Sequence, residues 1–66
     1  MKTMEVIYFT DVSGKNETRF SHVLVEDLFM SIYQDRESQI GFFEKEIAAT
    51  IKARAEQVKV MMFTEM

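Results

Sequence analysis

One segment near the start of the chain is apolar on both of its sides and reads Thr3-Met4-Glu5-Val6-Ile7-Tyr8-Phe9-Thr10. Its β-branched and aromatic residues, together with its length, predict a β-strand over residues 3–11. Side chains alternate across a strand, so Met4, Val6 and Tyr8 share one side while Ile7 and Phe9 share the other. Because both sides are largely apolar, the pattern favours a place at the centre of a sheet.

A turn and a second strand follow this segment. The turn residues Asp11-Val12-Ser13-Gly14-Lys15-Asn16 include Gly14 and Asn16, which both tolerate positive φ. Residues 17–25 then alternate as a strand, with Phe20, His22 and Leu24 on one face. Two strands around a short loop that contains glycine predict a β-hairpin.

The chain after the hairpin is predicted to be largely helical. Residues 27–34 fit either a short helix or a strand, and the acidic pair before their apolar run favours the helix. In residues 35–56 apolar side chains recur at steps of three and four, as on one stripe of a helix. This stripe consists of Ile40, Phe43, Ile47, Ile51 and Ala55. Gly41 costs about 1 kcal/mol relative to alanine inside a helix, so it marks either a kink or a break between two helices.

Residues 57–64 predict a final strand, which gives the element order β-β-α-β. A single helix that returns the chain by a right-handed crossover places this strand on the free edge of the first one. We therefore expect one domain over residues 1–66, of the α+β class. Its sheet is expected to have three strands, antiparallel or mixed, in the order 2-1-3, with one main helix on one face.

The composition limits how so short a chain is stabilised. A domain of this size buries only about 60% of the surface that its unfolded chain exposes. Disulfides are excluded because there is no cysteine, and His22 is the only histidine, so a structural zinc site is not expected. The chain is 47% hydrophobic and contains six Phe and six Met. The remaining sources of stability are an unusually apolar core and association with a partner.

Charge and hydropathy disfavour several classes of partner. The net charge of −3 argues against non-specific binding to nucleic acid or to anionic membranes, because both need a basic surface. No segment approaches the roughly 20 apolar residues of a membrane helix, and no apolar run follows Lys2 as in a signal peptide. With the lack of cysteine, this predicts a cytoplasmic protein of a bacterial cell or infected host, with no nucleic-acid and no membrane partner.

The sequence lacks the residue patterns that catalysis and cofactor binding require. His22 lies mid-strand without a nucleophile motif or a second positioned group for acid–base work. Asp11 and Glu17 flank a turn, and turn chemistry explains them. Glu44 and Glu46 point in different directions on the predicted helix and are expected on its solvated face. We expect no enzyme, no cofactor and no metal site.

One helical layer covers only one face of the predicted sheet, so the other face is expected to be exposed. Depending on the register of the strands, this open face carries either Met4, Val6 and Tyr8 or Ile7 and Phe9 of the first strand, beside apolar residues of the last strand. A contiguous patch of this kind marks an interface, and Met and aromatic residues are enriched at interface cores. The alternative is that residues 26–34 fold over this face and close a small core. The residues predicted for a partner interface are Tyr8, Phe20, Met61 and Phe63.

The start of the chain also resembles a known family. The segments Glu5-Val6-Ile7-Tyr8-Phe9 and Lys15-Asn16-Glu17-Thr18, followed by Phe20, are similar to the Dmd family of small bacteriophage antitoxins. The likeness continues in the order hairpin, helix, short final strand. The resemblance implies an inhibitor that binds a host messenger-RNA-degrading toxin and occludes its active site or dimer surface.

Together these observations predict a small, non-enzymatic protein-interaction module. The leading hypothesis is a phage or mobile-element inhibitor that binds a host protein such as a toxin or a nuclease. The alternative is a structural subunit that assembles into a homodimer through its open sheet face and has no inhibitory role.

Overall fold

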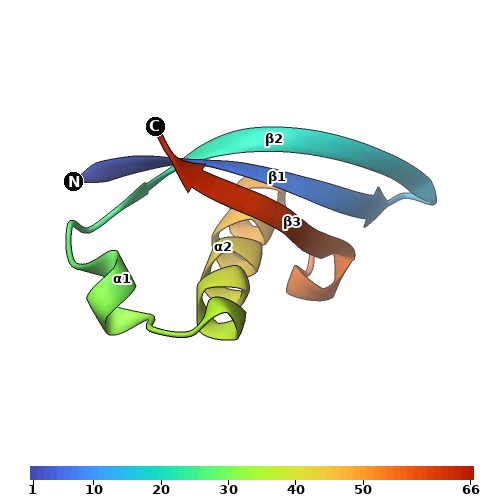
Figure 1. The fold of residues 1–66 in the computed structure, drawn as a ribbon. Coiled ribbons are helices and arrows are strands. Elements are labelled where there is room, and N and C mark those ends of the chain that lie inside the picture. The colour runs from blue at the N-terminus through green and yellow to red at the C-terminus, as the bar shows by residue number, and fades with distance from the viewer.

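Three strands form one antiparallel sheet in the order β2-β1-β3, and the helices lie on one of its faces (Figure 1). The computed structural model describes all residues, 1–66. Its elements are β1 (Lys2–Val12), β2 (Lys15–Val25), α1 (Phe29–Ile32), α2 (Arg36–Ile51), the short 3-10 helix η1 (Ala55–Gln57) and β3 (Val58–Glu65). The predicted α+β fold and strand order are confirmed, with β1 in the centre.

The β1–β2 hairpin has a tighter loop than the sequence pattern suggested. Val12 pairs with Lys15, so only Ser13 and Gly14 form the loop. Both loop residues have positive φ, 57° and 74°, as a type I′ turn requires. Ser13, and not Asn16, therefore takes the left-handed conformation, and β2 begins before residue 17. The loop end of the hairpin projects beyond α2 (Figure 1).

The core lies between α2 and one face of the sheet. Alternate residues of β1 are buried there, as the pattern of the strand predicted. The buried apolar residues of the sheet and of α2 are Met4, Val6, Tyr8, Val25, Val58, Val60, Phe43, Ile47 and Ala48. Phe43 and Val6 are fully buried, so each side of this interface contributes a side chain with no exposed surface.

A β-bulge in β3 changes which residues of that strand face the core. Val60 pairs with Tyr8 and Met62 pairs with Ile7, so Met61 is the extra residue between the two pairs. Paired residues share a face of the sheet, and the bulge shifts the alternation by one position. Core-facing residues of β3 are therefore even-numbered before the bulge and odd-numbered after it.

Five aromatic rings join α1, α2 and β3. The ring of Phe43 is central, and its centroid lies 5.2 Å from Phe29, 5.5 Å from Phe42 and 4.9 Å from Phe63. Tyr33 completes the cluster at 5.1 Å from Phe29 and 5.2 Å from Phe42. Tilted and edge-on pairs at these separations are favourable beyond the area that they bury. The cluster holds α1 against the end of the core.

This position of α1 decides between the two predictions for the segment after the hairpin. The segment is helical, although only over Phe29–Ile32. It packs beside α2 and on the same side of the sheet (Figure 1). The alternative in which it closes over the opposite face of the sheet is wrong.

The start of α2 is fixed by a side-chain cap. Asp35 accepts hydrogen bonds from the Ser38 N–H at 3.3 Å and from the Ser38 hydroxyl at 2.6 Å. Gln39 is buried and donates to the carbonyl of Tyr33 at 2.6 Å, which ties α2 to the end of α1. The helix continues through Gly41 without a break.

The prediction that this helix reaches residue 56 is wrong. α2 ends at Ile51, and Lys52 adopts a left-handed φ of 60°. The Ala53 N–H donates to the Ala48 carbonyl at 2.8 Å, as in a Schellman motif. Ala55, expected on the helical stripe, lies in η1 and is exposed. The prediction failed because Ile51 and Ala55 are spaced as on a helix, and no glycine at position 52 indicates that the helix ends there.

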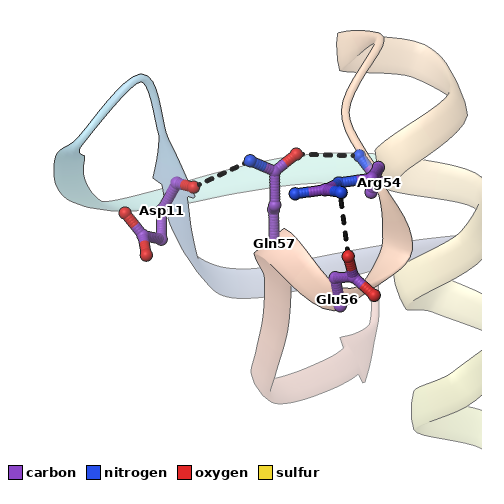
Figure 2. Close-up of polar contacts among 4 residues, drawn as sticks. All are labelled: Asp11, Arg54, Glu56 and Gln57. Carbon is purple, nitrogen blue, oxygen red and sulfur yellow. Dashed lines mark hydrogen bonds and ion pairs between the residues drawn. The ribbon is translucent and has the colours of Figure 1, made fainter.

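Gln57 fixes the connection between α2 and β3 (Figure 2). Its side-chain oxygen accepts a hydrogen bond from the Arg54 N–H at 3.0 Å, and its side-chain nitrogen donates to the Asp11 carbonyl at 3.2 Å. Arg54 also forms an ion pair with Glu56 at 3.2 Å. Because Asp11 lies near the end of β1, these contacts hold η1 beside the central strand and set where β3 begins.

Lys52→Gly is expected to raise the free energy of unfolding by roughly 1 kcal/mol, because glycine adopts positive φ without the Cβ clash. Urea unfolding followed by circular dichroism measures the change. Lys52→Ala is the matched control, since it removes the long side chain but keeps Cβ, and it should not stabilise. A Lys52→Gly protein no more stable than Lys52→Ala would contradict the left-handed helix end.

Asp35 is expected to make stability depend on acid pH. The hydrogen bonds from the hydroxyl and N–H of Ser38 lower the pKa of Asp35 below its ordinary 3.8. A carboxyl with a lowered folded pKa stabilises the fold above its unfolded pKa, and this contribution is lost as pH falls through the folded pKa. Ser38→Ala removes both the hydroxyl and its part of the shift. Urea unfolding should then show a smaller loss of stability between about pH 5 and about pH 3 than in the parent.

Candidate functional site

The sheet face turned away from α2 carries a row of apolar side chains. Ile7 of β1 pairs with Phe20 of β2 on one side and with Met62 of β3 on the other. Paired residues share a face, so the three side chains form a row across the whole sheet. Phe20 is 68% exposed and Met62 is 51% exposed, while Ile7 between them is half-buried.

Two further apolar side chains extend this row along the strands. Phe9 lies two residues after Ile7 on the same face and is half-buried. Leu24 lies near the end of β2 on the same face as Phe20 and is exposed. We call these five side chains the open-face patch, which consists of Ile7, Phe9, Phe20, Leu24 and Met62.

Along the strands, polar groups lie on both sides of the row formed by Phe20, Ile7 and Met62. On one side the Glu5 carboxylate lies 3.6 Å from the imidazole of His22, its partner across the β1–β2 pair. On the other side Phe9 is flanked by Thr18 and Lys59, its partners in β2 and β3. An apolar centre with a polar rim is the usual anatomy of a protein interface.

A shallow hollow of about 250 Å³ lies at the β2 end of the row. It is lined by Glu5, Ile7, Thr18, Arg19 and Phe20. Its walls combine the aromatic ring of Phe20 and the aliphatic side chain of Ile7 with the carboxylate of Glu5. A partner side chain seated there meets both apolar surface and a negatively charged group.

The structure separates the four residues that the sequence predicted for the interface. Phe20 lies in the open-face patch, and Met61 is 55% exposed at the bulge of β3. Tyr8 is only 4% exposed, and Phe63 packs against Phe43. The assignment of Tyr8 and Phe63 to an exposed interface is therefore corrected, because both side chains face α2.

The open-face patch instead uses the alternative set of β1, which the sequence offered equally. A signal for this choice was present in the strand itself. Within the segment Thr3–Thr10, the face with Ile7 and Phe9 carries Glu5, whereas the face with Met4, Val6 and Tyr8 carries no charge. Charged side chains are almost never fully buried without a partner, so the uncharged face is the better core.

The ion pairs of the chain are separate from one another and form no larger charged cluster. His22 and Glu5 lie together on the open face, between Leu24 and the row of Phe20, Ile7 and Met62, and both are substantially exposed. No group of three or more His, Cys, Asp or Glu side chains is placed to hold a metal ion. Neither helix has the length and apolar character needed to cross a membrane.

Glu44 has a structural role that differs from the predicted solvated one. Its side chain is half-buried and its Oε2 accepts a hydrogen bond from the Val60 N–H at 3.1 Å. The contact joins α2 to β3 next to the bulge. Glu46 is exposed, as expected for the outer face of the helix.

No protein-family model, curated protein or solved structure matches the chain. The interpretation of the open-face patch therefore depends on its residues and their geometry. The resemblance to the Dmd antitoxins stays a prediction from the sequence.

Alanine substitution of two phenylalanines is expected to separate the core from the open-face patch. Phe43→Ala should lower the free energy of unfolding by about 3–5 kcal/mol, because Phe43 is fully buried among other rings. Phe20→Ala should change it by less than about 0.5 kcal/mol, because the ring is exposed. Urea unfolding measures both. A large loss for Phe20→Ala would mean that the open face is covered in solution.

Proposed function

We propose that this protein is a protein-binding module that contacts its partner through the open-face patch and has no catalytic role of its own. The observation that carries the proposal is the exposed row of Phe20, Ile7 and Met62 across all three strands. Monomeric proteins rarely expose contiguous apolar patches of large side chains unless these bind something. The row lies on a sheet backed by the core, so its shape is largely formed before binding.

Burial of the open-face patch supplies energy for binding. Covering a Phe or Met side chain fully contributes about 1.5–3 kcal/mol relative to leaving it in water. Phe20 and Met62 both remain more than half exposed in the folded chain, so most of this contribution is still available to a partner. Side chains of this kind at the centre of an interface are where binding energy concentrates.

The charges around the open-face patch favour a protein over a nucleic acid or a lipid surface. Glu5 on one side and Lys59 on the other are of opposite sign, and the chain as a whole carries −3. Binding to phosphates or to anionic headgroups depends on a basic surface. A mixed rim suits the polar margin of another protein.

We further propose that binding inhibits the partner, and that the partner is a host toxin or nuclease in the cytoplasm of a bacterial or infected cell. The likeness of Glu5–Phe9 and Lys15–Phe20 to the Dmd antitoxins supports this step. Both segments belong to the β1–β2 hairpin, and between them they contain Ile7, Phe9 and Phe20 of the open-face patch. An inhibitor of this kind works by covering a surface that the partner needs.

The test is affinity capture with the tagged chain from a host-cell lysate, followed by mass spectrometry and by binding measurements on the purified partner. Phe20→Ser and Met62→Ser are each expected to weaken binding about tenfold or more. Leu28→Ser is the matched control, because Leu28 is 66% exposed but lies beside α1 and outside the open-face patch.

Three outcomes have distinct meanings. A partner that binds the parent and Leu28→Ser but not the two patch variants supports the proposal, and loss of the partner's own activity on binding supports inhibition. A partner that binds all four chains equally contradicts the proposed surface. A chain that captures nothing specifically contradicts the function.

A further inference from the structure

The two edges of the sheet are not equally open to another strand. β3 is short, carries the bulge at Met61, and has the N–H of Val60 already bonded to Glu44. Each of these features hinders pairing along an edge. β2 has eleven residues, contains no proline and pairs with β1 without interruption, so its outer edge has no bulge. Only β2 presents a complete template for a further strand.

The hairpin loop determines which backbone groups of β2 point outward. Val12 and Lys15 flank a two-residue loop with positive φ at both positions, and in a turn of this type the two flanking residues are a hydrogen-bonded pair. Such pairs alternate along an antiparallel ladder. The odd-numbered residues of β2 are therefore bonded to β1, and the even-numbered residues direct their N–H and C=O groups away from the sheet. The free edge begins at Asn16, and Thr18 is its second outward-facing residue.

The charges of β2 limit what can pair there. Glu17 and Arg19 share the face opposite to Phe20, lie 3.1 Å apart and are both about half exposed. A second copy in parallel register sets like charges against each other, which is destabilising. An antiparallel copy centred on Arg19 sets the two guanidinium groups against each other. An antiparallel copy centred on Thr18 sets each Glu17 against the Arg19 of the other chain.

We propose that two copies of this chain associate edge to edge through β2, antiparallel and centred on Thr18, to give one six-stranded sheet. Across the two-fold axis, the N–H of each Thr18 donates a hydrogen bond to the C=O of the other Thr18. Each Asn16 does the same with the Phe20 of the other copy. Glu17 and Arg19 then form two symmetric ion pairs at a non-hydrogen-bonded position, where side chains approach most closely.

This arrangement fits the rest of the fold. The loop of the second copy, Ser13 and Gly14, lies opposite Val23 and His22, and so stops before Val25, where β2 ends and the chain turns towards α1. Both copies keep their helices on the same side of the joined sheet, because the axis is perpendicular to it. The open-face patches lie side by side on the other face, where the side chain of Phe20 remains directed away from the helices while its backbone takes part in the edge contact.

The charges allow a complementation experiment. In Glu17→Arg both pairs become Arg against Arg, and in Arg19→Glu both become Glu against Glu. Each variant alone is expected to associate at least about tenfold more weakly than the parent in sedimentation equilibrium. An equimolar mixture of the two variants restores opposite charges at both pairs, and its association constant is expected to return to within about threefold of the parent value.

Three further chains serve as controls. Thr18→Pro removes the outward N–H at the centre of the proposed contact and is expected to abolish association. The pairing of β1 with β2 is expected to survive, because the Thr18 N–H donates no hydrogen bond to β1. Glu56→Arg reverses one charge of the similar Arg54–Glu56 pair on η1 and should associate like the parent. Met62→Ser lies on the open-face patch and should also associate like the parent. Circular dichroism establishes that each variant is folded.

Several results would overturn this proposal. A parent chain that sediments as a monomer at about 1 mM has no such edge contact. Single charge variants that associate as the parent does, or a mixture that stays as weak as its components, exclude the register centred on Thr18. Loss of association in Met62→Ser together with normal association in Thr18→Pro assigns the contact to the open face instead.

Discussion

A central strand that is apolar on both sides, with one long helix to cover it, is the constraint on which this structure depends. α2 can bury only one of the two sides of β1, and it takes the side with Val6 against Phe43. The other side stays in water with Ile7 and Phe9 half-buried by their neighbours in the sheet. The open-face patch exists because no helix or strand covers this side of the sheet, and no special local conformation is needed to expose it.

The remaining elements enlarge the single core, because none of them is placed to build a second. α1 adds Phe29 to the rings around Phe43, at the end of the sheet where α2 begins. The bulge at Met61 turns Phe63 towards the same cluster. Gln57 and Glu44 tie β3 to β1 and α2 through one hydrogen bond each to the backbone. Side chains from both ends of the chain therefore converge on one helix, and Phe43 of this helix contacts rings from both α1 and β3.

The sequence was sufficient for the elements and their order, since strand alternation, helical periodicity and crossover handedness are local or topological rules. It was not sufficient for contacts that depend on the assembled sheet. In the sequence, only the charge of Glu5 indicates which side of β1 the helix covers. Met62 lies on the open face in place of Phe63 because of the bulge in β3, and no sequence pattern predicts this bulge. The end of α2 was missed because Lys52, a residue with no preference for positive φ, occupies the position where glycine is usual. Of the predicted interface, Phe20 was placed correctly on the open face because β2 has only one side rich in large apolar groups.

The strand order has a consequence for how the chain folds. β1 pairs with β2 through a two-residue loop but meets β3 only after about fifty intervening residues, so the hairpin can form long before the sheet is complete. Closing the longer loop costs more chain entropy and slows the second step. Until β3 docks, the hairpin leaves both apolar sides of β1 and two strand edges open, a state prone to aggregation. The rate at which β3 joins β1, more than the rate at which any helix forms, then sets how long a newly made chain remains vulnerable.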